Sequence, residues 1–155
     1  MNTVLILENI RSAQNVGAIF RTADAIGVSK IYLAGYTPAP VDKFNRPRKE
    51  IAKTALGAEK TIAWESIPET APLIERLKKD GFTVVAVEQA PVSIDYKKLK
   101  LAPKNAFIFG NEVEGVLADT LSIADKVIEI PMRGEKESLN VATTAGIVLF
   151  RALDK

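Results

Sequence analysis

The chain has 155 residues, of which 47% are hydrophobic and 26% are charged. Its 21 Lys and Arg residues against 19 Asp and Glu residues give a net charge of +2. This length and composition fit one ordinary domain with its own core. Cysteine and histidine are absent, which excludes thiol nucleophiles, disulfides, histidine bases and zinc sites built from these residues. Neither a signal-like N-terminus nor an apolar run long enough to span a bilayer is present, so we expect a cytoplasmic protein.

The apolar pattern alternates between short β-rich runs and longer helical stretches, which is typical of an α/β domain with a mostly parallel sheet. We expect strands at 3–7, 30–34, 61–64, 82–87, 106–109 and 126–130, and helices at 15–26, 50–58, 68–79 and 140–153. The third helix should have Pro68 near its first turn. Residues 1–155 are expected to form a single domain, and the chain contains neither a dinucleotide-binding nor a P-loop glycine pattern.

Polar residues follow the first expected strand, at the edge of the sheet where α/β proteins bind ligands. Asn15 can cap the first helix, and Arg21 lies six residues later, where its long side chain can reach the same edge. Taken alone, the local pattern favours a simple helix cap together with a solvated arginine over a ligand site.

Two later segments also carry polar residues that packing does not require. After the strand at 106–109, Gly110 and Gly115 allow close backbone approach and a tight turn, and Glu112 can accept hydrogen bonds from an arginine or from ligand hydroxyls. Ser138 or Asn140 can cap the last helix. Each segment by itself also fits a simple polar turn or loop.

Together the three segments resemble the SPOUT superfamily of RNA methyltransferases, and within it the SpoU or TrmH type that methylates ribose 2′-hydroxyls. The resemblance covers nearly the whole chain and includes the stretch at 53–59. It implies an α/β fold with a deep C-terminal trefoil knot, a homodimer whose active site is completed across the interface, and S-adenosyl-L-methionine as cofactor. No metal is required, and the chain corresponds to the minimal catalytic core of the family.

The resemblance also implies which residues form the site. The catalytic group comprises Asn15, Arg21, Glu112, Ser138 and Asn140. The cofactor-binding group comprises Val87, Glu88, Gly110, Asn111, Ile130, Met132, Ser138 and Leu139. Gln89 continues one wall of the cofactor site, and the apolar members suit an adenine slot.

A guanidinium group is a poor proton acceptor at neutral pH, so a role for Arg21 as a general base conflicts with its chemistry. We expect Arg21 instead to hold the adjacent phosphate and stabilise the developing alkoxide, with Glu112 orienting it and the proton leaving to phosphate or water. Asn15 and Asn140 would bond ribose or phosphate, and Ser138 would fix the methionine part of the cofactor or the nucleotide.

Positive charge concentrates in the long segment after the second expected strand, which predicts an RNA-binding strip. The expected RNA-binding residues are Arg11, Lys43, Arg46, Arg48, Lys49 and Arg133, with Lys136 as an extension. Such contacts supply affinity without sequence information, and a solvated basic loop is the alternative interpretation.

The favoured substrate is transfer RNA, with ribosomal RNA as the alternative. Two further interpretations stay open: an RNA-binding member that has lost catalysis, and a methyltransferase that modifies a base.

Overall fold

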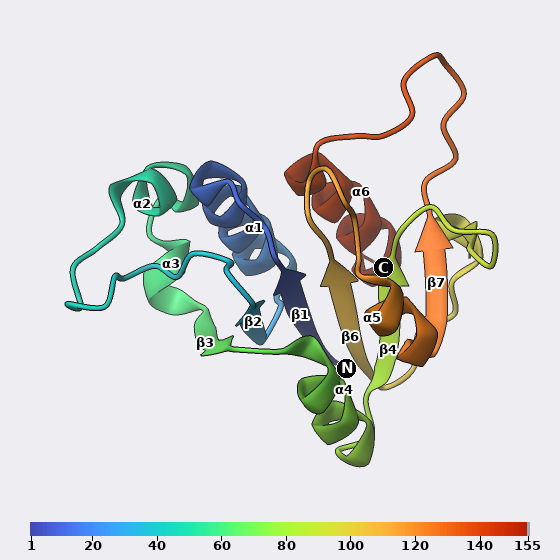
Figure 1. The fold of residues 1–155 in the computed structure, drawn as a ribbon, viewed down its shortest axis with the longest axis horizontal. Helices are drawn as coiled ribbons and strands as arrows, with labels where there is room; N and C mark the ends of the chain where they lie inside the picture. The colour runs from blue at the N-terminus through green and yellow to red at the C-terminus, as the bar shows by residue number, and fades with distance from the viewer. Residues whose placement is uncertain (155) are drawn as a thin grey trace.

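The structure is a computed structural model that describes residues 1–154 (Figure 1). The strands in this range are β1 (Asn2–Glu8), β2 (Lys30–Ala34), β3 (Ala63–Ile67), β4 (Thr83–Val87), β5 (Ile94–Asp95), β6 (Lys104–Phe109) and β7 (Lys126–Glu129). The helices are α1 (Ala13–Ile26), α2 (Lys49–Ala55), α3 (Ala58–Thr61), α4 (Thr70–Lys79), α5 (Ala118–Ile123) and α6 (Val141–Leu153), with a 3₁₀ turn at Tyr96–Lys98. None of these helices reaches the length and hydropathy needed to cross a membrane.

The strands form one sheet in the order β3-β2-β1-β6-β4-β7-β5, and every pairing among the described strands is parallel. The mostly parallel sheet predicted from the sequence is therefore confirmed. β6 lies between β1 and β4 although it follows β4 in the chain, with Leu5 of β1 opposite Phe107 of β6. Because parallel strands end at one edge, the segments that follow β1, β4, β6 and β7 meet there.

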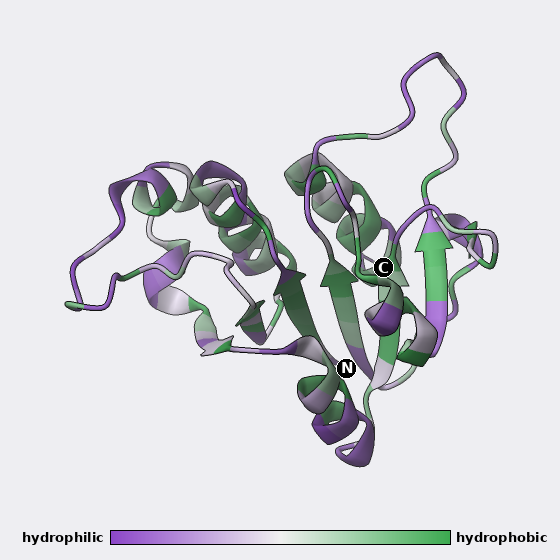
Figure 2. Ribbon diagram, viewed as in Figure 1, coloured by the Kyte–Doolittle hydropathy of each residue, from purple (hydrophilic) through white to green (hydrophobic). Residues whose placement is uncertain are grey.

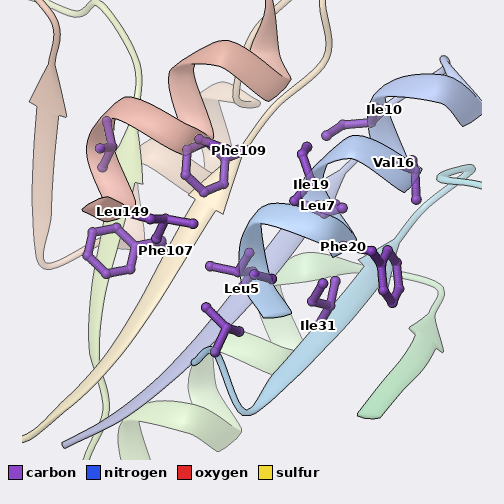
Figure 3. Packing of buried hydrophobic residues seen from close by; sticks show 14 of the residues in the cluster. Leu5, Leu7, Ile10, Val16, Ile19, Phe20, Ile31, Phe107, Phe109 and Leu149 are labelled. Carbon is purple, nitrogen blue, oxygen red and sulfur yellow. The ribbon is translucent and has the colours of Figure 1, made fainter. Parts of the chain in front are cut away.

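Side chains that alternate along the strands build a core on each face of the sheet. Leu5 and Leu7 of β1 pack with α1, α2 and α6, whereas Val4 and Ile6 pack with α4. Figure 3 shows Phe107, Phe109 and Leu149 packed together between β6 and α6. Figure 2 shows the apolar interior of the sheet and the hydrophilic outer side of α4. The fold is thus three layers, with helices covering both faces.

Two helix starts differ from prediction by two residues. α1 begins at Ala13 and is capped by Ser12, whose Oγ accepts a hydrogen bond from the Asn15 backbone N–H at 3.1 Å, so Asn15 lies inside the first turn and does not cap it. α4 begins at Thr70, after Pro68. Pro72 occupies the first turn instead, where the backbone N–H that proline lacks would have had no partner within the helix.

The single helix expected at 50–58 is divided into α2 and α3. Leu56 has φ +52° and Gly57 has φ +97°, and this left-handed backbone ends α2 before α3 begins. The following strand, β3, starts two residues later than expected, at Ala63. Neither the short strand β5 nor the helix α5 was predicted.

Candidate functional site

A cavity of about 230 Å³ lies at the carboxyl ends of β4, β6 and β7. We name the segment after β6 the β6 loop (residues 110–117) and the segment after β7 the β7 loop (residues 130–140). The cavity is lined by Val87, Glu88, Gln89, Phe109, Gly110, Asn111, Glu112, Val113, Glu114, Gly115, Glu129, Ile130, Met132, Ser138, Leu139, Asn140, Val141 and Thr144. The β6 and β7 loops therefore form facing walls of one hollow.

The fold gathers most of the expected site residues around this cavity. All eight residues expected to hold the cofactor line it, and so do Glu112 and Asn140 of the expected catalytic group. Sequence reasoning missed Glu129 and Thr144, which line the same hollow from the end of β7 and from α6. Both could have been predicted from their positions, because Glu129 lies near the end of the expected strand at this edge of the sheet and Thr144 lies about one turn after the start of the expected last helix.

The lining has a marked charge bias. Its ionisable side chains are Glu88, Glu112, Glu114 and Glu129, and no Lys or Arg lines it among residues 1–154. Apolar walls with a few directed polar groups are usual for a small-molecule site. Four carboxylates around such a hollow favour a ligand with positive charge over a phosphate-bearing nucleotide.

Gly110 and Gly115 allow the β6 loop to fold back on itself. The Asn111 and Gly115 backbones exchange two hydrogen bonds of 3.1 and 2.9 Å. A Cβ atom at Gly110 would lie 2.4 Å from the Val116 nitrogen, and Gly115 has φ +72°. Only glycine fits the first position without moving backbone, and the second favours it strongly.

Two glutamates fasten the far end of the β6 loop. The Glu8 carboxylate, only 1% exposed at the end of β1, accepts hydrogen bonds from the Leu117 N–H at 2.9 Å and from the Thr120 hydroxyl at 2.6 Å. Glu88 accepts one from the Val116 N–H at 2.9 Å. Sequence analysis gave Glu8 no role, although a carboxylate closing a buried strand is a signal that it needs a partner.

Glu112 fastens the other end of the loop to the turn before α1. Its carboxylate accepts hydrogen bonds from the Arg11 N–H at 3.0 Å and the Ser12 N–H at 2.9 Å. Burial raises the pKa of Glu112, but hydrogen bonds from Ser12, Arg11 and the Asn15 side chain outweigh it and hold this pKa below its ordinary value. The carboxylate is therefore ionised near neutral pH.

Asn15 and Asn140 come from opposite ends of the chain and meet here. The Asn140 side chain donates a hydrogen bond from Nδ2 to Asn15 Oδ1 at 3.1 Å. Asn140 Oδ1 accepts from the Ala142 and Thr143 N–H groups, so this residue also caps α6, as the sequence analysis allowed. The contact joins the starts of α1 and α6 beside the cavity.

The Asn111 side chain is occupied by the protein itself. Its Nδ2 donates hydrogen bonds to the Asn9 carbonyl at 2.8 Å and the Tyr36 hydroxyl at 2.9 Å. Its Oδ1 accepts from the N–H groups of Val113 and Glu114. Asn111 therefore shapes the wall of the cavity mainly by holding the β6 loop.

Arg21 lies apart from the cavity. It is exposed on α1 and lines a second hollow with Lys53 of α2 and Phe150 of α6. Within residues 1–154 no hydrogen bond or ion pair joins Arg21 to Glu112, whose carboxylate faces the turn before α1 instead. One copy of the chain thus places Arg21 outside the cavity around which the other expected catalytic residues gather.

The β7 loop contrasts with the β6 loop, because it extends away from the body of the molecule (Figure 1). Met132 is half-buried, but residues 133–140 are all exposed, Ser138 and Leu139 included. Two side-chain hydrogen bonds hold its exposed residues: Gln89 Nε2 donates to the Glu137 carbonyl at 2.7 Å, and Asn140, at the end of the loop, donates to Asn15.

The expected RNA-binding residues are all exposed, and they fall into separate places. Arg11 lies beside the site, with its guanidinium carbon 5.9 Å from the centre of the Tyr36 ring. The group at 43–49 is carried by the connection between β2 and α2, whereas Arg133 is on the β7 loop, and Figure 1 shows these two segments at opposite ends of the molecule.

Comparison with known proteins gives concordant results. The model of the SpoU rRNA Methylase family matches residues 2–150. The tRNA (guanosine(18)-2′-O)-methyltransferase of Thermus thermophilus is 34% identical over 96% of this chain and 72% of that protein. The 23S rRNA (guanosine-2′-O-)-methyltransferase RlmB of Neisseria meningitidis is 34% identical over 94% of this chain and 56% of its own length.

One solved structure of similar fold contains a bound ligand. The AdoMet-bound rRNA methyltransferase of Sinorhizobium meliloti superposes with a TM-score of 0.86 and 32% identity, covering 97% of this chain and 55% of that one. Since the family model spans almost the whole sequence and the relatives share its fold, the chain belongs to the SpoU rRNA methylase family.

Proposed function

We propose that the protein transfers a methyl group from S-adenosyl-L-methionine to a ribose 2′-hydroxyl of RNA, with transfer RNA as the favoured substrate and ribosomal RNA as the alternative. The observation that carries the proposal is the single cavity lined by all eight residues expected to hold the cofactor. The activities of the T. thermophilus and N. meningitidis relatives, on tRNA and on 23S rRNA, support the reaction and the two substrate classes.

The residues that line the cavity suit S-adenosyl-L-methionine in polarity and charge. Val87, Ile130, Met132 and Leu139 offer an apolar surface for an adenine ring. The carboxylates of the lining suit a ligand with positive charge on sulfur and on an amino group. When bound, this cofactor supplies a methyl group activated by the adjacent sulfonium.

The residues of this chain would act by holding and orienting the reactants. The β6 loop presents its wall in a fixed shape, which lowers the entropic cost of aligning a ribose oxygen with the methyl group. Asn15 and Asn140, already joined beside the cavity, offer amide groups to ribose or phosphate. Ser138, exposed on the β7 loop, is placed to bond the amino-acid part of the cofactor or the nucleotide.

Arg21 is proposed to serve the active site of a second copy of the chain. It is exposed on α1 beside the apolar side chain of Phe150, which is 41% exposed on α6, and Ile147 on the same helix is 36% exposed. Pairing these helix faces would bury apolar surface and carry Arg21 to the partner's cavity. There its permanent charge would hold a phosphate and stabilise the developing alkoxide, while the proton leaves to phosphate or water.

The same proposal includes the finer features of the family. We propose that residues 1–155 form one methyltransferase domain, that its C-terminal part is threaded as a trefoil knot, and that the enzyme acts as a homodimer in the cytoplasm without a metal. The interleaved strand order, with β6 between β1 and β4 and β7 beyond β4, supports a chain path of that kind.

The test is transfer of labelled methyl from S-adenosyl-L-methionine to separate pools of unmodified tRNA and rRNA, followed by digestion and mass spectrometry of the nucleosides. A 2′-O-methylnucleoside in one pool, lost with Arg21→Ala, is the expected result. Methyl groups on a base would overturn the ribose assignment. Cofactor binding without transfer to either pool would overturn the enzymatic assignment in favour of RNA binding alone.

To test Arg21 across a dimer, inactive Arg21→Ala subunits can be mixed with subunits inactivated by Asn140→Ala. If each active site combines groups from two copies, the mixture should regain part of the wild-type activity. In a mixed dimer, one of the two sites receives native Arg21 from one subunit and native Asn140 from the other. No recovery after verified subunit exchange would contradict a shared site.

A further inference from the structure

Resting on the proposed function, we propose that Phe44 stacks on an unpaired RNA base, at the tip of a turn distant from the cofactor cavity. We name residues 41–47 the β2–α2 turn. The neighbouring cations, Lys43 and Arg46, would contact the phosphates on either side of that base. The turn would thus select RNA with an accessible, unstacked nucleotide at a distance from the methylated one.

The first observation is the exposure of Phe44. This side chain is 64% exposed, and residues 43–50 around it are all exposed. Figure 2 shows the turn as a mostly hydrophilic segment at the end of the molecule opposite the β7 loop. A phenylalanine in such a segment contributes little to the core, so its ring is free to contact a ligand.

The second observation is that hydrogen bonds fix the backbone of the turn that carries this ring. Asp42 Oδ1 accepts hydrogen bonds from the Phe44 N–H at 2.8 Å and the Arg46 N–H at 3.0 Å. The Asp42 N–H donates to the Arg46 carbonyl at 2.9 Å, and Val41 and Pro47 pair as an antiparallel bridge. A ring on a prearranged turn loses little conformational entropy when it binds.

The third observation is the charge around the ring. Lys43 Nζ lies 5.1 Å and Arg46 Cζ 4.9 Å from the centre of the Phe44 ring. Arg46 also forms a 2.9 Å ion pair with Asp42, which fixes its position, and Arg48 and Lys49 continue the positive charge towards α2. An aromatic ring among cations is the combination that binds single-stranded nucleic acid, through stacking on the base and attraction to the backbone.

A nucleic-acid base is the occupant that these features favour. A protein partner would need an apolar patch, but Phe44 is the single large apolar side chain among residues 42–50. The flat face of one ring matches the flat face of one base. Because bases in a duplex are already stacked on each other, the accessible partner is a nucleotide in a loop or single strand.

The test measures binding to a single-stranded oligoribonucleotide without hairpins and to the same backbone with its bases removed. Wild type should prefer the base-containing strand, and Phe44→Ala should lose about five-fold or more in affinity for it while binding the base-free strand as wild type does. Phe44→Trp should restore the preference. Val92→Ala, which shortens an apolar side chain 74% exposed elsewhere, is the matched control and should change neither affinity.

The outcome separates this proposal from the proposed function. Equal losses on both strands, or no loss on either, would overturn the stacking role of Phe44 even if methyl transfer is intact. If wild type transfers no methyl group, the proposed function fails, but the two-strand comparison still decides the role of Phe44. In the active enzyme, Phe44→Ala should raise KM for RNA and leave both kcat at saturating RNA and cofactor affinity unchanged.

Discussion

The two loops that wall the cavity are built in opposite ways. The β6 loop is fastened at both ends by Glu8, Glu88 and Glu112, each of which accepts backbone N–H groups, and it is closed on itself by the Asn111–Gly115 pairing. The β7 loop projects from the body, and its exposed residues are held by the contact from Gln89 and, at the end of the loop, by the contact of Asn140 with Asn15. One wall is thus held by several hydrogen bonds within the protein, whereas the other has few.

The difference teaches how a small α/β domain can combine precision with access. A wall braced by charge-assisted hydrogen bonds fixes where the reacting groups lie. A wall with few contacts opens at low free-energy cost, which lets a cofactor enter and leave. Substitutions that weaken the braces should therefore reduce stability, whereas substitutions in the β7 loop should mainly alter its mobility.

The largest effect is expected for Glu8→Ala. Removing this buried carboxylate leaves the Leu117 N–H and the Thr120 hydroxyl without their acceptor, at a cost of about 3 kcal/mol in the free energy of unfolding. Urea unfolding followed by circular dichroism measures it. Glu135→Ala, which removes an exposed carboxylate from the β7 loop, is the control and should change stability little. Equal midpoints for the two variants would refute the bracing role of Glu8.

A matched pair of glycine substitutions compares the two walls directly. A Cβ at Gly110 meets the backbone of Gly115 and Val116 at 2.4 Å, whereas a Cβ at Gly134 meets nothing within 4 Å. Gly110→Ala should destabilise the protein by about 1–3 kcal/mol and, if the proposed function is correct, weaken S-adenosyl-L-methionine binding ten-fold or more. Gly134→Ala should be neutral or slightly stabilising.

Calorimetric titration measures the affinity of each glycine variant for the cofactor, and thermal unfolding measures its stability. Unchanged stability and affinity in Gly110→Ala would show that the β6 loop yields more readily than its packing indicates. A loss in Gly134→Ala as large as that in Gly110→Ala would show that the β7 loop is equally constrained, and the contrast between the walls would fail.

The braced wall is also where prediction from sequence was least complete. The nearly continuous apolar runs of β1 and β6 indicate strands buried on both faces, and strands ending at Glu8 and Phe109 place the following segments at one edge. That local pattern was sufficient to predict the parallel sheet. It was insufficient for the partners of Glu8, because Leu117 and Thr120 are more than a hundred residues away in the chain.

The site residues show the same limit. The family resemblance identified residues that line the cavity, because its motifs lie on the loops after β4, β6 and β7. Local propensity chose Asn15 as a helix cap, but Ser12 takes that place and Asn15 turns to Asn140, 125 positions later. In one copy of the chain Arg21 lines a different hollow from the cavity, and no local pattern encodes that separation.

A smaller effect is expected from acid, acting through Glu112. The pKa of this carboxyl lies below its ordinary value, so its stabilising effect is fully present above the unfolded pKa of about 4.3 and is lost as pH falls through the lower folded pKa. Glu112→Gln should cost about 1 kcal/mol at pH 7, because the charge-assisted bonds to Arg11 and Ser12 become neutral ones. The difference between wild type and variant should shrink below about pH 4.

Unfolding midpoints of both proteins between pH 7 and pH 3 provide the measurement. A difference that is constant across this range would mean that ionisation of Glu112 does not contribute to bracing. A difference that grows as pH falls would contradict the direction of the pKa shift itself.

The smallest effect on stability is expected for Gln89→Ala, which removes the hydrogen bond to the Glu137 carbonyl of the β7 loop. The free energy of unfolding should change by less than about 0.5 kcal/mol, since Gln89 is exposed. Limited trypsin cleavage after Arg133 or Lys136 should nevertheless become faster, while cleavage after Lys43 in the β2–α2 turn keeps its wild-type rate. Faster cleavage at all of these positions would indicate general loosening and not a local release.

S-Adenosylhomocysteine, the product form of the proposed cofactor, extends the same measurement to the ligand. If the β7 loop gains its contacts from what occupies the cavity, this ligand should slow cleavage at Arg133 and Lys136 in wild type and leave the rate at Lys43 unchanged. In Gln89→Ala the ligand should still slow cleavage, because Ile130, Met132 and Leu139 remain to close over it. If the ligand binds but leaves the cleavage rate unaltered in both proteins, the β7 loop does not close on it, and the proposed coupling between the ligand and this wall fails.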